Sequence, residues 1–292
     1  MPSTTRTTRQ GDGTIIVSPS NESLQSATVI ICHGLGDTAE GFVDVAEHLS
    51  TTLPHVKFIF PTAKTQKVTM NMGMAMPSWY DIVGLDKRSN EFCNGIEDSR
   101  RRIEELLRNE HEQLGVPYNR MVLAGFSQGG ALSLYTGMQL SQRLAGIVIL
   151  SGYLPHESGF TISTNNGVES TPIWHGHGAN DPLVRVTAAN DSQSTVKAKG
   201  ATNYTLKTYP GLAHSINPQE INDVLSFLQQ ILPPGGGGDD GEFKVKLKEP
   251  SEMSVKELKA AISKAGLGRL AVGLMEKREF VELLQNHRDG KL

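Results

Sequence analysis

The sequence predicts an α/β protein whose mostly parallel sheet is covered by helices on both faces, followed by a small helical segment. Short apolar, β-rich runs alternate with amphipathic stretches over most of the 292 residues. These runs are mostly apolar throughout rather than alternating, which is typical of buried parallel strands. At 234–242 the composition changes to proline, glycine and acidic residues, which indicates a flexible linker.

The strands and helices are expected in the first part of the chain, residues 13–233. Six runs carry the strand pattern: 28–34, 56–61, 120–126, 144–152, 172–178 and 203–211. A helix is expected over 97–114, because Ile103, Leu106 and Leu107 fall on one face with Leu114, and Gly115 ends it. The order of these elements predicts one α/β domain.

The second part, residues 243–292, has the pattern of two short helices joined by a glycine-containing connection. Ser254 and Glu257 form the expected capping box of the first helix. The apolar faces consist of Val255, Leu258 and Ile262 in the first helix and of Phe280, Leu283 and Leu284 in the second. We expect either a separately folded helical module or a tail packed on the first domain.

Composition and charge exclude several classes of protein. The formal charge is −3 and the sequence pI is about 6.3, which gives no signal for nucleic-acid binding and allows transient membrane-surface contact at most. The N-terminal stretch has no apolar signal core, and no run is long enough to span a bilayer. Two cysteines are too few for a disulfide scaffold, so we expect a reducing, cytoplasmic environment.

Residues 125–129 read Gly-Phe-Ser-Gln-Gly and match the G-x-S-x-G pattern of a nucleophile elbow. The match lies directly after the expected strand 120–126 and before a helical run, which is the context that an elbow requires. Without that context an ordinary glycine turn would be the better interpretation. Ser127 is therefore the candidate nucleophile.

A serine nucleophile needs a base and an orienting acid, which in this kind of fold follow it in the order acid, then histidine. Asp181 follows the strand 172–178, and His214 follows the strand 203–211. Each alone could be a loop residue. Together, in this order, they predict a Ser127–His214–Asp181 triad.

Three other histidines allow a metal-site hypothesis. His175 and His177 are two residues apart on a strand and would share one face, and His33 lies in the glycine-rich loop 33–36. The local sequence offers Asp181 as the only further ligand, and the triad already uses it. We therefore expect structural histidines, no metal and no cofactor.

The glycine-rich loop after the strand 28–34 has the position of an oxyanion loop. We expect the backbone N–H of Leu35 to join that of Gln128 in stabilising a tetrahedral oxyanion. A structural turn at the same place is compatible with this role.

With these residues assigned, the sequence resembles the acyl-protein thioesterase and lysophospholipase family of α/β-hydrolases over roughly 13–233. The motifs are HGLGDTAEGF, VTMNMGMAMPSWYDI, GFSQGGALSLY, HGANDPLV and KTYPGLAHS, in family order. The resemblance implies an α/β-hydrolase fold, the triad and oxyanion donors named above, and hydrolysis of palmitoyl thioesters on protein cysteines or of lysophospholipids. The chain departs from the family in having Ala179 where many members carry a further acid, and in lacking an N-terminal cysteine for lipidation.

The stretch 68–82 is the candidate acyl-chain site. If it is extended, its alternate methionines lie on one side, and methionine adapts to an apolar ligand. The candidate acyl contacts are Met70, Met72, Met74, Met76 and Trp79. A strand or lid packed on the core is the alternative, and the resemblance, which implies a loop beside the active site, favours acyl contact.

Two other functions remain as alternatives. The first is a lysophospholipase or short-chain carboxylesterase that uses the same triad on oxygen esters. The second is an adaptor that acts through residues 243–292, which weakly resemble a SAP-like helix-loop-helix. Acidic and basic residues are interspersed there, so a protein partner is favoured over DNA.

Overall fold

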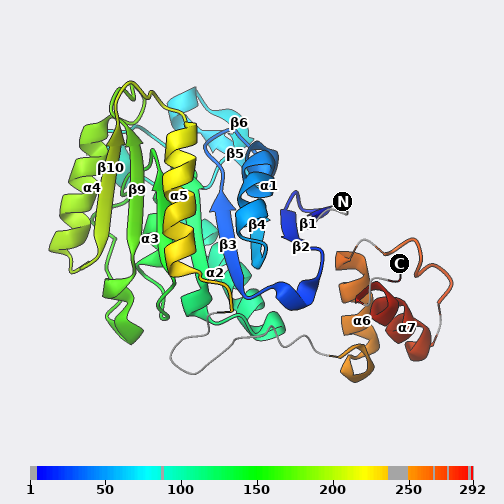
Figure 1. Ribbon diagram of the computed structural model, residues 1–292. Helices are drawn as coiled ribbons and strands as arrows, with labels where there is room; N and C mark the ends of the chain where they lie inside the picture. The colour runs from blue at the N-terminus through cyan, green and yellow to red at the C-terminus, as the bar shows by residue number, and fades with distance from the viewer. Residues whose placement is uncertain are drawn as a thin grey trace.

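The computed structural model describes residues 5–86, 89–235, 249–265, 267–274, 276–288 and 291. Its main sheet has eight strands (Figure 1). In spatial order they are β1 (Thr5–Arg9), β2 (Ile15–Pro19), β4 (Val56–Phe60), β3 (Ala27–Cys32), β7 (Met121–Phe126), β8 (Gly146–Leu150), β9 (Ile173–Gly178) and β10 (Tyr204–Tyr209).

The sheet is parallel from β4 to β10, and β1 and β2 pair antiparallel at one edge. The six strands expected from apolar runs are confirmed as β3, β4, β7, β8, β9 and β10. Because parallel strands end at one edge of the sheet, the segments after β3, β7, β9 and β10 meet there. These segments carry all the residues of the expected triad and oxyanion loop.

Helices cover both faces of the sheet, as expected for an α/β fold. They are α1 (Val43–Thr52), α2 (Ile96–Leu114), α3 (Gln128–Gly137), α4 (Val186–Ala198) and α5 (Pro218–Ile231). The apolar residues of α1 and α5 belong to one buried cluster, and those of α2, α3 and α4 to the other. Figure 1 shows α1 and α5 on the near side of the sheet, with α2 and α3 behind it. Gly115 ends α2 at φ 74°, as the sequence predicts.

The methionine-rich segment is not one extended strand, so the condition under which its methionines would lie on one side is not met. It forms a hairpin of β5 (Thr65–Val68) and β6 (Met74–Pro77), joined by a short 3-10 turn. Met72 lies at the tip with φ 56°, a left-handed conformation that breaks the alternation of side chains. The four methionines therefore do not share one face.

The C-terminal helices α6 (Val255–Lys264) and α7 (Lys277–Arg288) pack against each other around their own apolar cluster. The Ser254–Glu257 capping box is present. Leu258, Ile262, Phe280 and Leu284 are buried. Val255, which the sequence places on the same apolar face, is 39% exposed and is therefore not part of the buried cluster.

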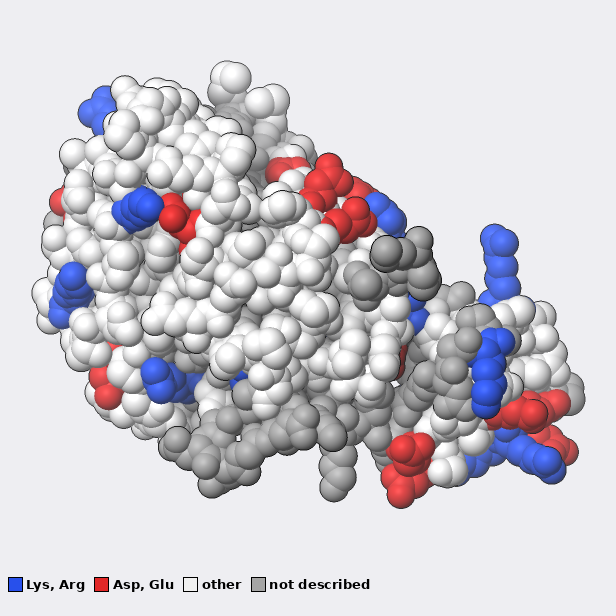
Figure 2. All heavy atoms as spheres, viewed as in Figure 1, with Lys and Arg blue, Asp and Glu red and all other residues white. Residues whose placement is uncertain are grey.

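The pair α6–α7 lies beside the β1–β2 edge of the sheet (Figure 1), where His287 contacts Arg6. On the face drawn in Figure 2, positive and negative side chains are interspersed over both parts of the molecule. None of the described helices is both long and apolar enough to cross a bilayer.

Candidate active site

Ser127 lies between β7 and α3, at φ 52° and ψ −117°. This backbone conformation is strained for a residue with a side chain and is that of a sharp strand-to-helix turn. Glycines make the turn possible. A Cβ on Gly125 would lie 2.3 Å from the carbonyl carbon of Gly129, and one on Gly129 would lie 2.1 Å from the carbonyl oxygen of Cys32. The elbow thus packs directly on the end of β3.

The three residues of the expected triad come together at the carboxyl edge of the sheet. His214 Nε2 lies 2.9 Å from Ser127 Oγ, and His214 Nδ1 lies 2.6 Å from Asp181 Oδ2. His214 is in the loop after β10, and its ring packs on Phe126 with the ring centroids 4.8 Å apart. A serine hydroxyl, an imidazole and a carboxylate in this line can transfer a proton from oxygen to nitrogen.

Asp181 is buried in a turn that holds its carboxylate in place. Its Oδ1 accepts hydrogen bonds from the backbone N–H groups of Leu183 and Val184, each at 2.9 Å. Its Oδ2 is left for His214 and lies 3.6 Å from His177 Nε2. With one oxygen fixed by the backbone, the other has a defined direction toward His214.

His175 and His177 are hydrogen-bonded to each other, and His177 lies next to Asp181. His177 Nε2 lies 2.7 Å from the carbonyl oxygen of Val184, which makes it the donor, so Nδ1 accepts from His175 Nε2 at 3.3 Å. His175 Nδ1 in turn accepts from the Tyr204 hydroxyl at 2.8 Å. Burial lowers the pKa of both histidines. All four ring nitrogens thus have protein partners, which accounts for the pair without a metal ion.

The loop after β3 places Leu35 beside the elbow. Gly34 approaches so closely that a Cβ there would lie 3.6 Å from Ser127 Cβ. The N–H groups of Gly36 and Asp37 donate to Pro77 O and Gly34 O, whereas the N–H of Leu35 has no partner among the residues that the structure describes. Gln128 begins α3, so its N–H has no partner within the helix.

The candidate acyl contacts have different surroundings. Met70, Met72 and Met74 are 40%, 90% and 54% exposed, whereas Met76 is half-buried. Met76 adjoins the loop after β3, because a Cβ on Gly36 would lie 3.6 Å from its Sδ. Trp79 is buried, and its indole N–H donates to the carbonyl oxygen of His33 at 2.8 Å.

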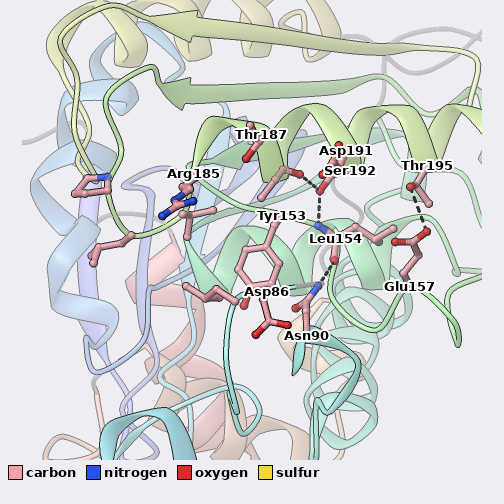
Figure 3. A pocket seen from close by; sticks show the side chains of 15 residues that line it. Asp86, Asn90, Tyr153, Leu154, Glu157, Arg185, Thr187, Asp191, Ser192 and Thr195 are labelled. Carbon is pink, nitrogen blue, oxygen red and sulfur yellow. Dashed lines mark hydrogen bonds between the residues drawn. The ribbon is translucent and has the colours of Figure 1, made fainter. Parts of the chain in front are cut away.

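A cavity of about 530 Å³ adjoins the turn of Asp181. Residues 182–185 line one side of it, and α4 lines another. Figure 3 shows Thr187, Asp191 and Ser192 of α4 near Tyr153 and Leu154. The charged side chains in its lining are Asp86, Glu157, Arg185 and Asp191. The lining residues come from three separated stretches, 85–90, 153–157 and 182–195, so no single sequence motif indicates the cavity.

A serine, a histidine and an aspartate joined in this way, on a mostly parallel sheet with an elbow after a central strand, are typical of α/β-hydrolases. The protein is thus a serine hydrolase of that fold. The chain belongs to the phospholipase/carboxylesterase family, whose profile matches residues 12–232. The family-level resemblance drawn from the motifs is confirmed, and the match ends before the C-terminal helices.

Its relatives include proteins named acyl-protein thioesterase. Acyl-protein thioesterase 1 of Cryptococcus neoformans is 37% identical over 233 residues, covering 74% of this chain and 96% of that protein. Acyl-protein thioesterase 1 homolog 1 of Dictyostelium discoideum is 40% identical over 210 residues, covering 71% and 92%. The crystal structure of Zea mays acyl-protein thioesterase 2 is similar with a TM-score of 0.65 at 26% identity, covering 75% of this chain and 98% of that one.

Proposed function

We propose that this protein hydrolyses long-chain acyl thioesters on protein cysteines, palmitoyl thioesters above all. Ser127 is the nucleophile, His214 the general base and Asp181 the residue that orients the histidine. The observation that carries the proposal is the continuous hydrogen-bonded line from Asp181 Oδ2 through His214 to Ser127 Oγ. The names of the relatives add the substrate class.

In the first half-reaction Ser127 Oγ attacks the thioester carbonyl carbon, while His214 Nε2 takes the hydroxyl proton. The carbonyl oxygen becomes an oxyanion, which the N–H groups of Leu35 and Gln128 stabilise. When the oxyanion collapses, the carbon–sulfur bond breaks and the cysteine sulfur leaves with the proton from His214. The acyl group is then an ester on Ser127.

In the second half-reaction water takes the place of the cysteine. His214 removes a proton from the water as it attacks the Ser127 ester, and returns it to Ser127 Oγ when the fatty acid leaves. The reaction consumes only water, so no cofactor is proposed. Thiolates leave more readily than amines, so the same site disfavours peptide bonds.

We place the acyl chain along the β5–β6 hairpin, starting at Met76 beside the oxyanion loop. Exposed methionines offer a flexible apolar surface that adapts to chain length. The cavity near Asp181 suits a chain less well, because four charged side chains line it and an apolar chain would remove them from water.

A lysophospholipase or short-chain carboxylesterase activity is the second candidate, because the family description names phospholipases and carboxylesterases. It needs the same triad and the same acyl site, with an alcohol rather than a thiol as leaving group. The two functions therefore differ in the leaving group alone.

A comparison of two substrates tests the proposal. The specificity constant kcat/KM is measured for a palmitoyl-cysteine peptide and for lysophosphatidylcholine below its micellar concentration, with released thiol and released fatty acid as readouts. We expect the peptide to be the better substrate by at least tenfold, or about 1.4 kcal/mol of transition-state stabilisation. A preference for lysophosphatidylcholine would assign the protein to the second candidate.

A further inference from the structure

His33, which the triad does not use, lies at the start of the oxyanion loop and is 1% exposed. Its Nε2 lies 2.9 Å from the backbone nitrogen of Ala63, which can only donate, so Nε2 accepts. A neutral ring then carries its proton on Nδ1, which lies 2.6 Å from the carbonyl oxygen of Gly34. The direction of both hydrogen bonds is therefore fixed by the Ala63 N–H. Burial lowers the pKa of His33, which keeps the ring neutral.

The bond to the Gly34 carbonyl matters because of the next atom in the chain. In a trans peptide the C=O and the following N–H point in opposite directions. The N–H that follows the Gly34 carbonyl is that of Leu35, the expected oxyanion donor. A hydrogen bond that holds the carbonyl on one side of the loop thus holds the N–H of Leu35 on the other.

We propose that His33 is a positioning residue of the oxyanion hole: its Nδ1–H fixes the Gly34 carbonyl and thereby aims the Leu35 N–H at the substrate oxygen. This inference rests on the proposed hydrolytic mechanism. The turn itself provides a second constraint, because Asp37 N–H also donates to Gly34 O at 3.2 Å and Gly36 has φ 79°. These features are those of a type II turn over residues 34–37.

Trp79 ties this loop to the second donor. Its indole N–H donates to His33 O at 2.8 Å, and its backbone N–H donates to Gln128 Oε1 at 3.0 Å. The side-chain nitrogen of Gln128, Nε2, in turn donates to Tyr80 O at 2.7 Å. The buried segment 78–80 therefore bonds to the peptide that precedes the Gly34–Leu35 peptide and to the side chain of Gln128.

Two substitutions separate the hydrogen bonds of His33. Asn places an amide N–H where Nδ1 stands and can still donate to Gly34 O. Gln reaches the position of Nε2, so it can accept a hydrogen bond from Ala63 N–H. It offers no donor to the Gly34 carbonyl. We expect His33→Gln to lower kcat on the order of 100-fold with little change in KM, as when one oxyanion donor is lost. His33→Asn should stay within about tenfold of wild type.

The assay uses p-nitrophenyl acetate, which a serine hydrolase turns over whatever its acyl preference. Failure of the palmitoyl proposal would thus leave this test intact, and a wild-type protein inactive on every ester would refute the hydrolytic mechanism itself. The second readout is affinity for a short-chain trifluoromethyl ketone, whose tetrahedral adduct with Ser127 needs the oxyanion donors. It should weaken in parallel with kcat.

His55→Gln is the matched control, since His55 is also a buried histidine bonded to a backbone carbonyl, Leu232 O at 2.8 Å, but lies before β4, at the edge of the sheet opposite the site. It should leave kcat unchanged. The inference is overturned if folded His33→Gln keeps wild-type kcat, or if Asn and Gln lower kcat equally. If His33→Gln does not fold, His33→Asn decides. It keeps a donor to Gly34 O, so a folded Asn variant whose kcat and ketone affinity fall by about 100-fold would also overturn the inference.

Discussion

Ser127 occupies a backbone conformation that costs a residue with a side chain about 1–3 kcal/mol. The surrounding contacts maintain it, since Ser127 N–H donates to Leu150 O at 2.8 Å and Ala131 N–H donates to Ser127 O at 3.0 Å. Neither bond involves the hydroxyl. The side chain is thus free for chemistry, and its removal leaves these backbone bonds intact.

We therefore expect Ser127→Ala to abolish hydrolysis without unfolding the protein. Loss of a triad nucleophile leaves the residual activity of the oxyanion hole and binding, a fall on the order of 10⁴-fold or more in kcat. Turnover of a soluble thioester and circular dichroism are the measurements. A correctly folded variant with a large share of the activity would disprove the assignment of Ser127.

Glu220, near the start of α5, is a buried carboxyl group outside the triad. Neither of its carboxyl oxygens has a hydrogen-bond partner among the described residues. Burial raises its pKa from 4.5 to about 7, with repulsion from Asp223 as a further cause. Between these two values the folded protein keeps a proton that the unfolded chain has lost, so stability falls as the pH rises through this window.

We expect Glu220→Gln, which stays neutral, to remove this loss. The free energy of unfolding of the variant relative to wild type should increase from pH 5 to pH 8 by about 2.5 kcal/mol, since most of the range between the two pKa values lies within these limits. Thermal unfolding at both pH values measures it. The exposed Glu105→Gln in α2 is the control and should show no such trend. A pH-independent difference for Glu220→Gln would show that the group is already charged in the folded protein.

At the scale of elements, the β5–β6 hairpin is the part most open to adaptation. Its tip presents Met72 and Met74 to solvent, so their substitution does not disturb the core. Each methylene removed from water contributes about 0.8 kcal/mol, so an acyl chain on this surface would bind more strongly with length.

We expect Met72→Asp with Met74→Asp to reduce kcat/KM for palmitoyl thioesters far more than for acetyl esters. The rise of kcat/KM with chain length in the wild type should flatten in the double variant. Ala188→Phe, which projects into the cavity near Asp181, is the comparison. If Ala188→Phe flattens the rise of kcat/KM with chain length and the double methionine variant does not, the acyl chain occupies the cavity and not the hairpin.

The elements that sequence reasoning could locate are those with uniform apolar composition. The run 121–126 could be predicted as a strand because every side chain before Phe126 is buried. β1, with the sequence TRTTR, and β5, with TQKV, are edge or hairpin strands whose polar residues carry no such signal. The alternate methionines have the residue pattern of a single strand. The structure departs from that pattern at Met72, because the sequence periodicity does not indicate a left-handed backbone conformation there.

Within the site, order along the chain and strand ends identified Ser127, Asp181 and His214, because parallel strands bring such residues together. The sequence predicts His33, His175 and His177 as structural histidines, but their hydrogen-bond partners could not be predicted. These partners include Ala63, Val184 and Tyr204, whose positions only the tertiary structure defines.

For the whole molecule, the boundary between the two parts is set near Pro233. Arg120 donates to Pro233 O at 2.9 Å and His55 bonds Leu232 O, which fix the end of the hydrolase domain on the sheet. Beyond it, α6 and α7 bury a separate apolar cluster. One contact between this pair and the sheet joins His287 to Arg6.

We therefore expect a chain ending at Pro234 to keep its turnover of soluble thioesters and its fold. What it should lose is localisation or binding of a protein partner through α6–α7. Steady-state kinetics and thermal unfolding of both chain lengths make the comparison. Loss of most soluble-substrate activity, or unfolding, would show that the helical pair belongs to the catalytic domain.

The most direct measurement of the central claim follows both products of the first half-reaction. A palmitoyl-cysteine peptide is mixed with the protein in stoichiometric amount, released thiol is followed over time, and acid-quenched samples are digested and analysed by mass spectrometry. We expect the thiol to appear together with a palmitoyl group on Ser127, which then disappears as free palmitate forms. Consumption of the peptide with no acyl group on Ser127 at any time, or with the group on another residue, would contradict a Ser127 acyl-enzyme.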